Sequence, residues 1–438
     1  MITKYKVFIV PLVFVFALLL LNTNVSSTYA KKLEDLSNFS KLDISTKNTI
    51  QQYPLEVQKK LVTQATEMND VFNILDKVFG SYEAFSDKGT IYLSNSGEII
   101  IGLTGISDEK LNTLKASLQV IDEDNLIKFE SVKYSINELE QIQDEVALAV
   151  QRLIEDKSVI TDLDLIDKKI TVSVEDLKTD EEQKILSYLN QNNYIDLIQL
   201  KSHDKSMNPY GELARARNWT KLGGGIQLRN AYDHLCTTAG IGKKGTNYFV
   251  LTAAHCLDSN NTYVKQDTAT LGVVHSRGHY SNIDVGLIRV TTASTITRYA
   301  TNYFYELAEN KDDYDRRVTG SSTPIQGQFV CKSGITTGVT CGNISTLKTT
   351  YIDPNGLAPG TRNVARITPL SGVDYSQPGD SGAITYDPST YRVVGIHSGG
   401  GGLTGLMTRI NDVISLYSDS TNTFSIYSSS TDALLVSK

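Results

Sequence analysis

The chain has 438 residues and a formal net charge of −7, a length that fits two or three domains. An acidic balance without a basic patch argues against a nucleic-acid partner. Four cysteines without a CxxC pair or a histidine-rich ligand set argue against a metal site, and no cofactor is expected.

The N-terminus has the pattern of a secretory signal. Two lysines within Met1–Lys6 precede an apolar run at Val7–Leu21, and a stretch of small residues then ends at Ala30. The apolar run is shorter than the roughly 20 residues that cross a bilayer, which disfavours a membrane anchor. We therefore expect residues 1–30 to be a cleaved signal peptide and the protein to be secreted, extracellular and monomeric, without a stable membrane anchor.

Residues 31–210 have the pattern of a folded α+β domain. Apolar residues recur at helical spacing, a serine and a glutamate three residues apart form a capping-box pattern, and one short run alternates as a strand does. The segments that carry these signals are Leu55–Phe79, the helix that Ser135 and Glu138 open towards Glu155, the strand Ile170–Val174 and the helix Thr179–Asn193.

A break in the pattern follows. Met207–Gly211 is rich in turn residues, and basic side chains and a glycine run come next (Arg215, Arg217, Lys221 and Gly223–Gly225). This composition predicts an accessible processing linker over 211–225. Residues 31–210 carry 32 acidic against 20 basic side chains, whereas residues 211–438 carry 17 against 20. The two parts should therefore attract each other.

From residue 226 onward the sequence is β-like. Short β-branched and aromatic runs alternate with Gly, Asn, Asp and Ser, which is typical of an all-β sandwich or barrel. A helix is expected at Asn411–Tyr417, and residues 419–438 give no clear signal. Four cysteines allow three disulfide pairings, and local spacing favours Cys236–Cys256 and Cys331–Cys341.

Three short segments carry candidate chemistry. His255 follows an apolar strand-like run, Asp284 begins another, and Ser381 lies between glycines in Gly379–Gly382. A serine hydroxyl needs a neighbouring base, and that base needs a third group to hold its tautomer. We predict Ser381 as the nucleophile, His255 as the base and Asp284 as its orienting group. The N–H groups of Gly379 and Ser381 would form an oxyanion hole.

These segments, in the order His, Asp, Ser, resemble the signature peptides of the chymotrypsin-like serine proteases. Asp284–Arg289 and Cys331–Gly342 resemble segments of the bacterial streptogrisin and α-lytic protease group. Lys133–Leu139 is similar, more weakly, to part of the pro-segments of that group.

The resemblance implies an all-β protease domain over 226–418, built as two six-stranded antiparallel barrels of the chymotrypsin-like fold. An α+β pro-domain over 31–210 would assist folding and act as an intramolecular inhibitor. The activity implied is that of a secreted serine endopeptidase, made as a zymogen, that hydrolyses protein or peptide substrates through an acyl-enzyme. Residues 419–438 have no counterpart in the group.

Gly395–Gly400 resembles the strand that lines the primary specificity pocket. The substrate-binding residues implied are His397, Ser398, Gly399, Gly400 and Pro378, with Ser398 bonded to Asp284. Glutamyl endopeptidases have a histidine where His397 stands, and it binds the acidic side chain of the substrate, although Gly400 and Pro378 replace serines found in some of them. An imidazole can donate a charge-assisted bond to a carboxylate.

Tyr375 stands where trypsin-like relatives have an aspartate, which argues against Arg or Lys specificity, although Asp374 is adjacent. No cysteine lies near Ser381, whereas the relatives have a disulfide by the pocket. We expect cleavage after Glu and, second, after Asp. The alternative is a preference for apolar substrate residues, with His397 as a core residue. For the whole chain, the alternative is a catalytically silent protease homologue that acts as a binding module. An esterase is disfavoured because the Gly-x-Ser-x-Gly elbow is missing. Self-processing would follow Glu212, with Arg215 and Arg217 as alternative cleavage sites.

Overall fold

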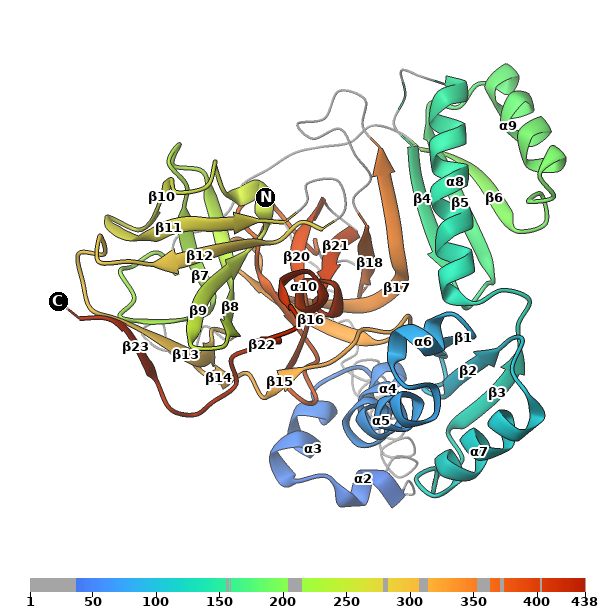
Figure 1. Ribbon diagram of the computed structural model, residues 1–438, viewed down its shortest axis with the longest axis horizontal. Helices are drawn as coiled ribbons and strands as arrows, with labels where there is room; N and C mark the ends of the chain where they lie inside the picture. The colour runs from blue at the N-terminus through green and yellow to red at the C-terminus, as the bar shows by residue number, and fades with distance from the viewer. Residues whose placement is uncertain are drawn as a thin grey trace, which may run out of the picture.

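The computed structural model describes residues 37–154, 157, 159–203, 215–278, 283–306, 314–352, 363–370, 374–401 and 404–437. The predicted signal peptide and Glu212 lie outside these ranges. Figure 1 shows a helix-rich N-terminal region beside two bodies built of strands.

The N-terminal region has two lobes. In the first, six helices accompany a three-stranded sheet: α2 (Ser37–Lys41), α3 (Ile44–Gln51), α4 (Leu55–Thr66), α5 (Met68–Phe79), α6 (Tyr82–Ser86) and α7 (Asp108–Gln119), with β1 (Gly89–Leu93), β2 (Ile99–Leu103) and β3 (Ile127–Ser131). In the second, two helices accompany a strand trio: α8 (Ile136–Ile154) and α9 (Thr179–Gln191), with β4 (Val159–Asp164), β5 (Lys169–Glu175) and β6 (Ile198–His203).

Local signals in this region are confirmed. Ser135 N donates to Glu138 Oε2 (2.7 Å) and Glu138 N donates to Ser135 Oγ (3.2 Å), which is the predicted capping box at the start of α8. The predicted strand at 170–174 and helix at 179–193 are β5 and α9. The helical stretch at 55–79 is two helices, because Glu67 interrupts it between α4 and α5.

The C-terminal half contains two closed barrels of antiparallel strands. In the first barrel the pairing order returns to its start through β7, β10, β11, β12, β9 and β8. Its strands are β7 (Lys221–Arg229), β8 (Leu235–Lys244), β9 (Asn247–Thr252), β10 (Tyr263–Gln266), β11 (Ala269–Arg277) and β12 (Gly286–Val290). The flanking strands are β13 (Arg298–Phe304), β14 (Arg316–Arg317), β22 (Phe424–Ile426) and β23 (Ala433–Val436).

The second barrel closes through β16, β19, β20, β21, β18 and β17. Its strands are β16 (Phe329–Gly334), β17 (Gly338–Ile352), β18 (Val364–Pro369), β19 (Ile384–Tyr386), β20 (Arg392–Gly401) and β21 (Thr404–Arg409), followed by α10 (Ile410–Tyr417). The short β15 (Gly320–Ser321) pairs with β20. Two six-stranded barrels are the predicted chymotrypsin-like fold, and α10 confirms the predicted helix near the end.

One predicted boundary is wrong. The linker expected over 211–225 is too long, because Lys221–Gly225 forms the start of β7 and its glycines are buried in the first barrel. Residues 419–438, which give no clear signal in the sequence, contain β22, which pairs with β8, and β23, which pairs with β13. Phe424 is fully buried in the core that joins the two barrels.

The N-terminal region continues the second barrel's sheet. Val159–Asp162 of β4 pairs antiparallel with Thr349–Ile352 of β17, so one sheet runs from the barrel through β4 to β6 (Figure 1). The predicted charge attraction appears at this contact. Its ion pairs are Lys348–Asp144 (2.7 Å), Arg409–Glu140 (2.9 Å) and Arg366–Asp162 (3.0 Å).

Helix α4 makes the other main contact with the second barrel. Gln64 Nε2 donates to the carbonyl of Phe329 (3.0 Å) and to Asp387 Oδ2 (2.9 Å), and Phe329 N donates to Gln64 Oε1 (2.8 Å). Lys60 Nζ donates to the carbonyl of Gly327 (3.1 Å). These side chains occupy the places that a neighbouring strand's peptide groups would fill.

Candidate active site

The three candidate residues come from both barrels. His255 lies in the 3₁₀ turn η1 (Ala254–Cys256) after β9, and Asp284 lies two residues before the first residue of β12. Pairing of β9 with β12 brings Thr252 opposite Gly286, which places η1 beside Asp284. Ser381 lies in the turn before β19 of the second barrel.

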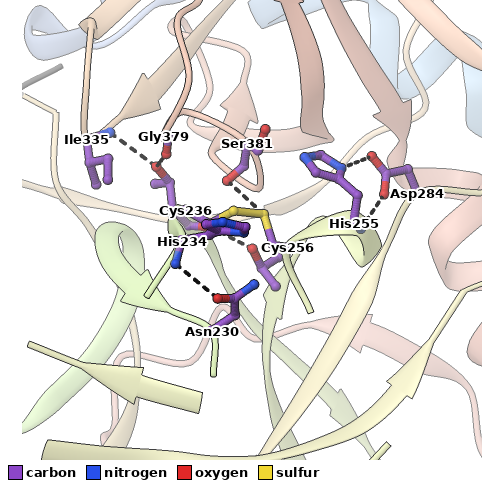
Figure 2. The surroundings of a disulfide bond; sticks show 11 residues. Asn230, His234, Cys236, His255, Cys256, Asp284, Ile335, Gly379 and Ser381 are labelled. Carbon is purple, nitrogen blue, oxygen red and sulfur yellow. Dashed lines mark hydrogen bonds and ion pairs between the residues drawn. A yellow bond between two sulfur atoms is a disulfide. The ribbon is translucent and has the colours of Figure 1, made fainter. Parts of the chain in front are cut away.

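His255 and Asp284 are joined by two bonds. His255 Nδ1 lies 2.8 Å from Asp284 Oδ2, and His255 N donates to Asp284 Oδ1 (3.0 Å). Asp284 is 2% exposed, whereas the His255 side chain is 29% exposed. Figure 2 shows the imidazole between Asp284 and Ser381, with its other edge turned towards Ser381.

The nucleophile turn is held against the first barrel. Thr237 N donates to the carbonyl of Ser381 (2.8 Å), and the disulfide Cys236–Cys256 lies next to this contact (Figure 2). Gly379 has φ 102°, a conformation that favours glycine. Within the described ranges, no protein acceptor is recorded for the N–H of Gly379 or of Ser381.

A buried ion pair that the sequence did not reveal lies beside Ser381. Lys332 Nζ lies 3.1 Å from Asp380 Oδ2, and both side chains are 0% exposed. Burial lowers the pKa of Lys332 to about 8, against the opposing effect of Asp380. Burial would raise the pKa of Asp380, but the Lys332 charge and several donated bonds outweigh it and leave that pKa lowered. The only sign of this pair in the sequence is Asp380, which directly precedes Ser381.

His397 lies beside the same turn. Gly382 N donates to the carbonyl of His397 (2.7 Å), and His397 N donates to the carbonyl of Ala383 (2.9 Å). The ring is 0% exposed, and its Nε2 lies 2.6 Å from Ser376 Oγ, a contact that sequence reasoning did not predict. No protein partner is recorded for Nδ1 among the described residues. Burial lowers the pKa of His397 to about 3.

The other predicted pocket residues lie in β20 and in the turn that carries Ser381. Ser398 Oγ lies 2.9 Å from Thr408 Oγ1, which donates to the backbone carbonyl of Asp284 (3.2 Å), so a threonine links Ser398 to Asp284. Thr336 Oγ1 donates to the carbonyl of Pro378 (2.8 Å). A Cβ on Gly399 would meet no atom within 4 Å, and Gly400 has φ 132°. The buried ring of Tyr375 is centred 5.9 Å from that of His397.

The four cysteines form two disulfides. Both favoured disulfides are present, Cys236–Cys256 and Cys331–Cys341. In the part of the chain that the structure describes, no group of three or more His, Cys, Asp or Glu side chains could hold a metal ion. No helix among those residues is long and apolar enough to span a bilayer.

Comparison with known proteins agrees with this geometry. Residues 211–416 match the family model described as Trypsin. Serine protease 1 of Streptomyces fradiae is 30% identical over 185 residues, which are 42% of this chain and 46% of that protein. The chain thus spans less than half the length of that relative. Glutamyl endopeptidase 2 of Streptomyces griseus is 29% identical over 184 residues, 42% of this chain and 84% of that protein.

Among solved structures, Thermobifida fusca protease A is 25% identical with a TM-score of 0.36, covering 47% of this chain and 100% of that one. Nocardiopsis protease is 28% identical with a TM-score of 0.35, covering 44% and 95%. The matched family, the sequence relatives and the two closed barrels agree with one another. The C-terminal half of this chain belongs to the trypsin family of serine proteases, on its bacterial branch.

Proposed function

We propose that this protein is a serine endopeptidase in which Ser381 attacks the peptide carbonyl. The observation that carries the proposal is the 2.8 Å contact between His255 Nδ1 and Asp284 Oδ2. Because this contact places the proton on Nδ1, Nε2 remains a base that can accept the Ser381 proton. His255 then returns the proton to the leaving amine, and water hydrolyses the acyl-enzyme.

The developing negative charge needs donors that are already in position. The N–H groups of Gly379 and Ser381, which have no recorded protein acceptor among the described residues, supply them. Each such donor typically contributes about 3–4 kcal/mol of transition-state stabilisation.

The activity is tested with Ser381→Ala. This variant is expected to lose peptide hydrolysis by about 10⁶-fold and to stop reacting with a fluorophosphonate probe. Ser425→Ala, at an exposed serine of β22, is the matched control and should behave as wild type. Full activity in purified Ser381→Ala would refute the proposal.

The proposed preference is for Glu at the residue before the cleaved bond, with Asp second. It is supported by the buried His397 beside the nucleophile turn and by the similarity to a glutamyl endopeptidase. A substrate carboxylate in an apolar pocket needs a hydrogen-bond donor, since an unpaired buried charge is costly. His397 Nε2 and Ser376 Oγ, which lie 2.6 Å apart, would supply the donors. Relative kcat/KM on matched Glu and Leu peptides measures this preference.

The N-terminal region is proposed to be a pro-domain that assists folding and restrains the enzyme before its removal. The charge-paired contact and the shared sheet support this role. Hydrogen bonds and ion pairs join this region to β16, β17, β18 and β21 of the second barrel and also to Gln326 and Asp387. Secretion after removal of residues 1–30 is part of the same proposal.

A further inference from the structure

Arg215 is a buried cation that the proposed chemistry does not use. It stands just before β7 and is 6% exposed. Its carbonyl accepts bonds from Trp219 Nε1 (3.3 Å) and from Gln227 N (3.4 Å), so its backbone belongs to the first barrel. Trp219 itself is buried in that barrel's core. The indole of Trp219 thus anchors the C-terminal end of the segment Arg215–Trp219 in the first barrel.

The Arg215 guanidinium reaches across to the second barrel. It donates to the carbonyl of Gly225 in β7 (3.1 Å) and to Ser333 Oγ in β16 (2.7 Å). Its carbon lies 4.5 Å from the centre of the Tyr305 ring. Ser333 Oγ in turn donates to the carbonyl of Tyr305, which follows β13 of the first barrel. One arginine therefore joins the two barrels through fully buried bonds.

The strand that Arg215 holds is adjacent to the nucleophile turn. Ser333 pairs with Ile384 in β19, three residues after Ser381. Its neighbour Lys332 forms the buried ion pair with Asp380, and a Cβ on Gly334 would collide with Asp380 Oδ1. A shift of β16 would therefore displace Asp380 and the turn that carries Ser381.

We propose that Arg215 is a positioning residue that clamps the two barrels to each other beside the nucleophile turn, and that the segment Arg215–Trp219 consequently stays in the mature enzyme. The inference rests on the proposed endopeptidase activity. His255 and Asp284 belong to the first barrel and Ser381 to the second, so the distance from His255 Nε2 to Ser381 Oγ depends on how the barrels sit. A misplacement of about 1 Å can cost roughly 100-fold in rate.

The placement also bears on activation. Arg215 and Arg217 are the alternative cleavage sites that the sequence suggests. Cleavage after Arg215 would remove the clamp, and cleavage after Arg217 would separate it from Trp219. Processing must therefore occur before Arg215. The clamp and the Lys332–Asp380 pair are both formed in the intact chain.

The test compares Arg215→Met, Arg215→Lys and Arg217→Gln in the full chain after maturation. Arg217 lies over the Trp219 ring (3.7 Å) in the same segment and is the matched control. Arg215→Met, which keeps the stem and loses the donors, is expected to lower kcat by about 10–100-fold with KM nearly unchanged. Arg215→Lys should recover part of kcat, and Arg217→Gln should match wild type.

Wild-type kcat in Arg215→Met, or a rise in KM with kcat unchanged, would overturn the inference. N-terminal sequencing of the mature wild-type enzyme decides independently if Arg215→Met does not fold. A first residue at or before Arg215 supports the clamp, and a fully active enzyme that begins after Arg215 refutes it. Failure of the endopeptidase proposal looks different, because wild type itself would then lack Ser381-dependent hydrolysis.

Discussion

At the scale of single residues, burial sets the protonation state of His397. Its pKa of about 3 means that the ring is neutral in the free enzyme at neutral pH. A substrate carboxylate placed next to it would favour the charged imidazolium and raise that pKa. The proton needed for a charge-assisted bond is therefore expected to be taken up when a Glu side chain enters.

His397→Val tests this expectation. The variant should lose kcat/KM on a Glu peptide by about 2–4 kcal/mol more than on a matched Leu peptide, because the carboxylate loses its donor. Ser376→Ala, which removes the partner 2.6 Å from Nε2, should shift the same ratio in the same direction. Steady-state kinetics on the two peptides measures both effects.

An unchanged Glu/Leu ratio in His397→Val would show that the ring is a core residue. A wild-type preference for large apolar residues would show the same. The pH profile alone does not decide, because acid also protonates His255 and stops catalysis by another route.

At the scale of elements, the side-chain amide of Gln64 in α4 makes the hydrogen bonds that a neighbouring strand would make with Phe329. This amide satisfies both the N–H and the carbonyl of Phe329 and also reaches Asp387, which is buried. Burial raises the pKa of Asp387, and the bonds it accepts, including that from Gln64, lower it in part. The N-terminal region thus completes the hydrogen bonding at one end of β16.

Substitution of Gln64 should destabilise the full chain in two distinguishable ways. Gln64→Leu leaves buried polar groups without hydrogen-bond partners, and each such group lowers the free energy of unfolding by about 1–3 kcal/mol. Gln64→Glu places a second carboxylate beside Asp387, so each raises the other's pKa. The folded state then binds more protons than the unfolded state, and the loss of stability should shrink as pH falls from 7.5 to 5.5.

Urea unfolding at the two pH values measures this, with Glu56→Gln on the exposed face of α4 as the control. A Gln64→Glu penalty that is the same at both pH values, or larger at pH 5.5, would contradict the assigned contact.

The sequence predicts elements whose signals are local. Ser135 and Glu138 cap α8 within one turn, and the alternation at Ile170–Val174 marks β5. The peptides around His255 and Ser381 are equally local, which is why the sequence alone indicates a candidate site. The pairing of β4 with β17 and the bond from Gln64 to Phe329 join residues far apart in the chain. The spacing of apolar residues along the sequence does not indicate such long-range contacts. The Ser376 contact with His397 was missed for the same reason.

At the scale of the whole molecule, each barrel closes by pairing strands that are distant in sequence, and such topologies nucleate slowly. The N-terminal region supplies β4 as a neighbour for β17 and Gln64 as a partner for β16. A preformed partner of this kind reduces the entropy that must be lost before the barrel strands stabilise one another.

Residues 215–438 produced alone, which keep Arg215, are therefore expected to refold at least about 10-fold more slowly than the full chain. Refolding from urea, followed by recovery of fluorophosphonate labelling, measures the rate. Full-length Ser381→Ala, followed by tryptophan fluorescence, controls for self-digestion. Equally rapid recovery of activity without residues 37–203 would rule out a folding role for the N-terminal region.

The placement of β22 and β23 has a consequence for the timing of synthesis. These last strands pair with β8 and β13, and Phe424 fills the core between the barrels. A ribosome makes β8 long before it makes Phe424, so the growing chain carries an apolar gap between its two barrels until its end emerges. The two barrels are therefore expected to reach their final arrangement only after the last residues of the chain have been made.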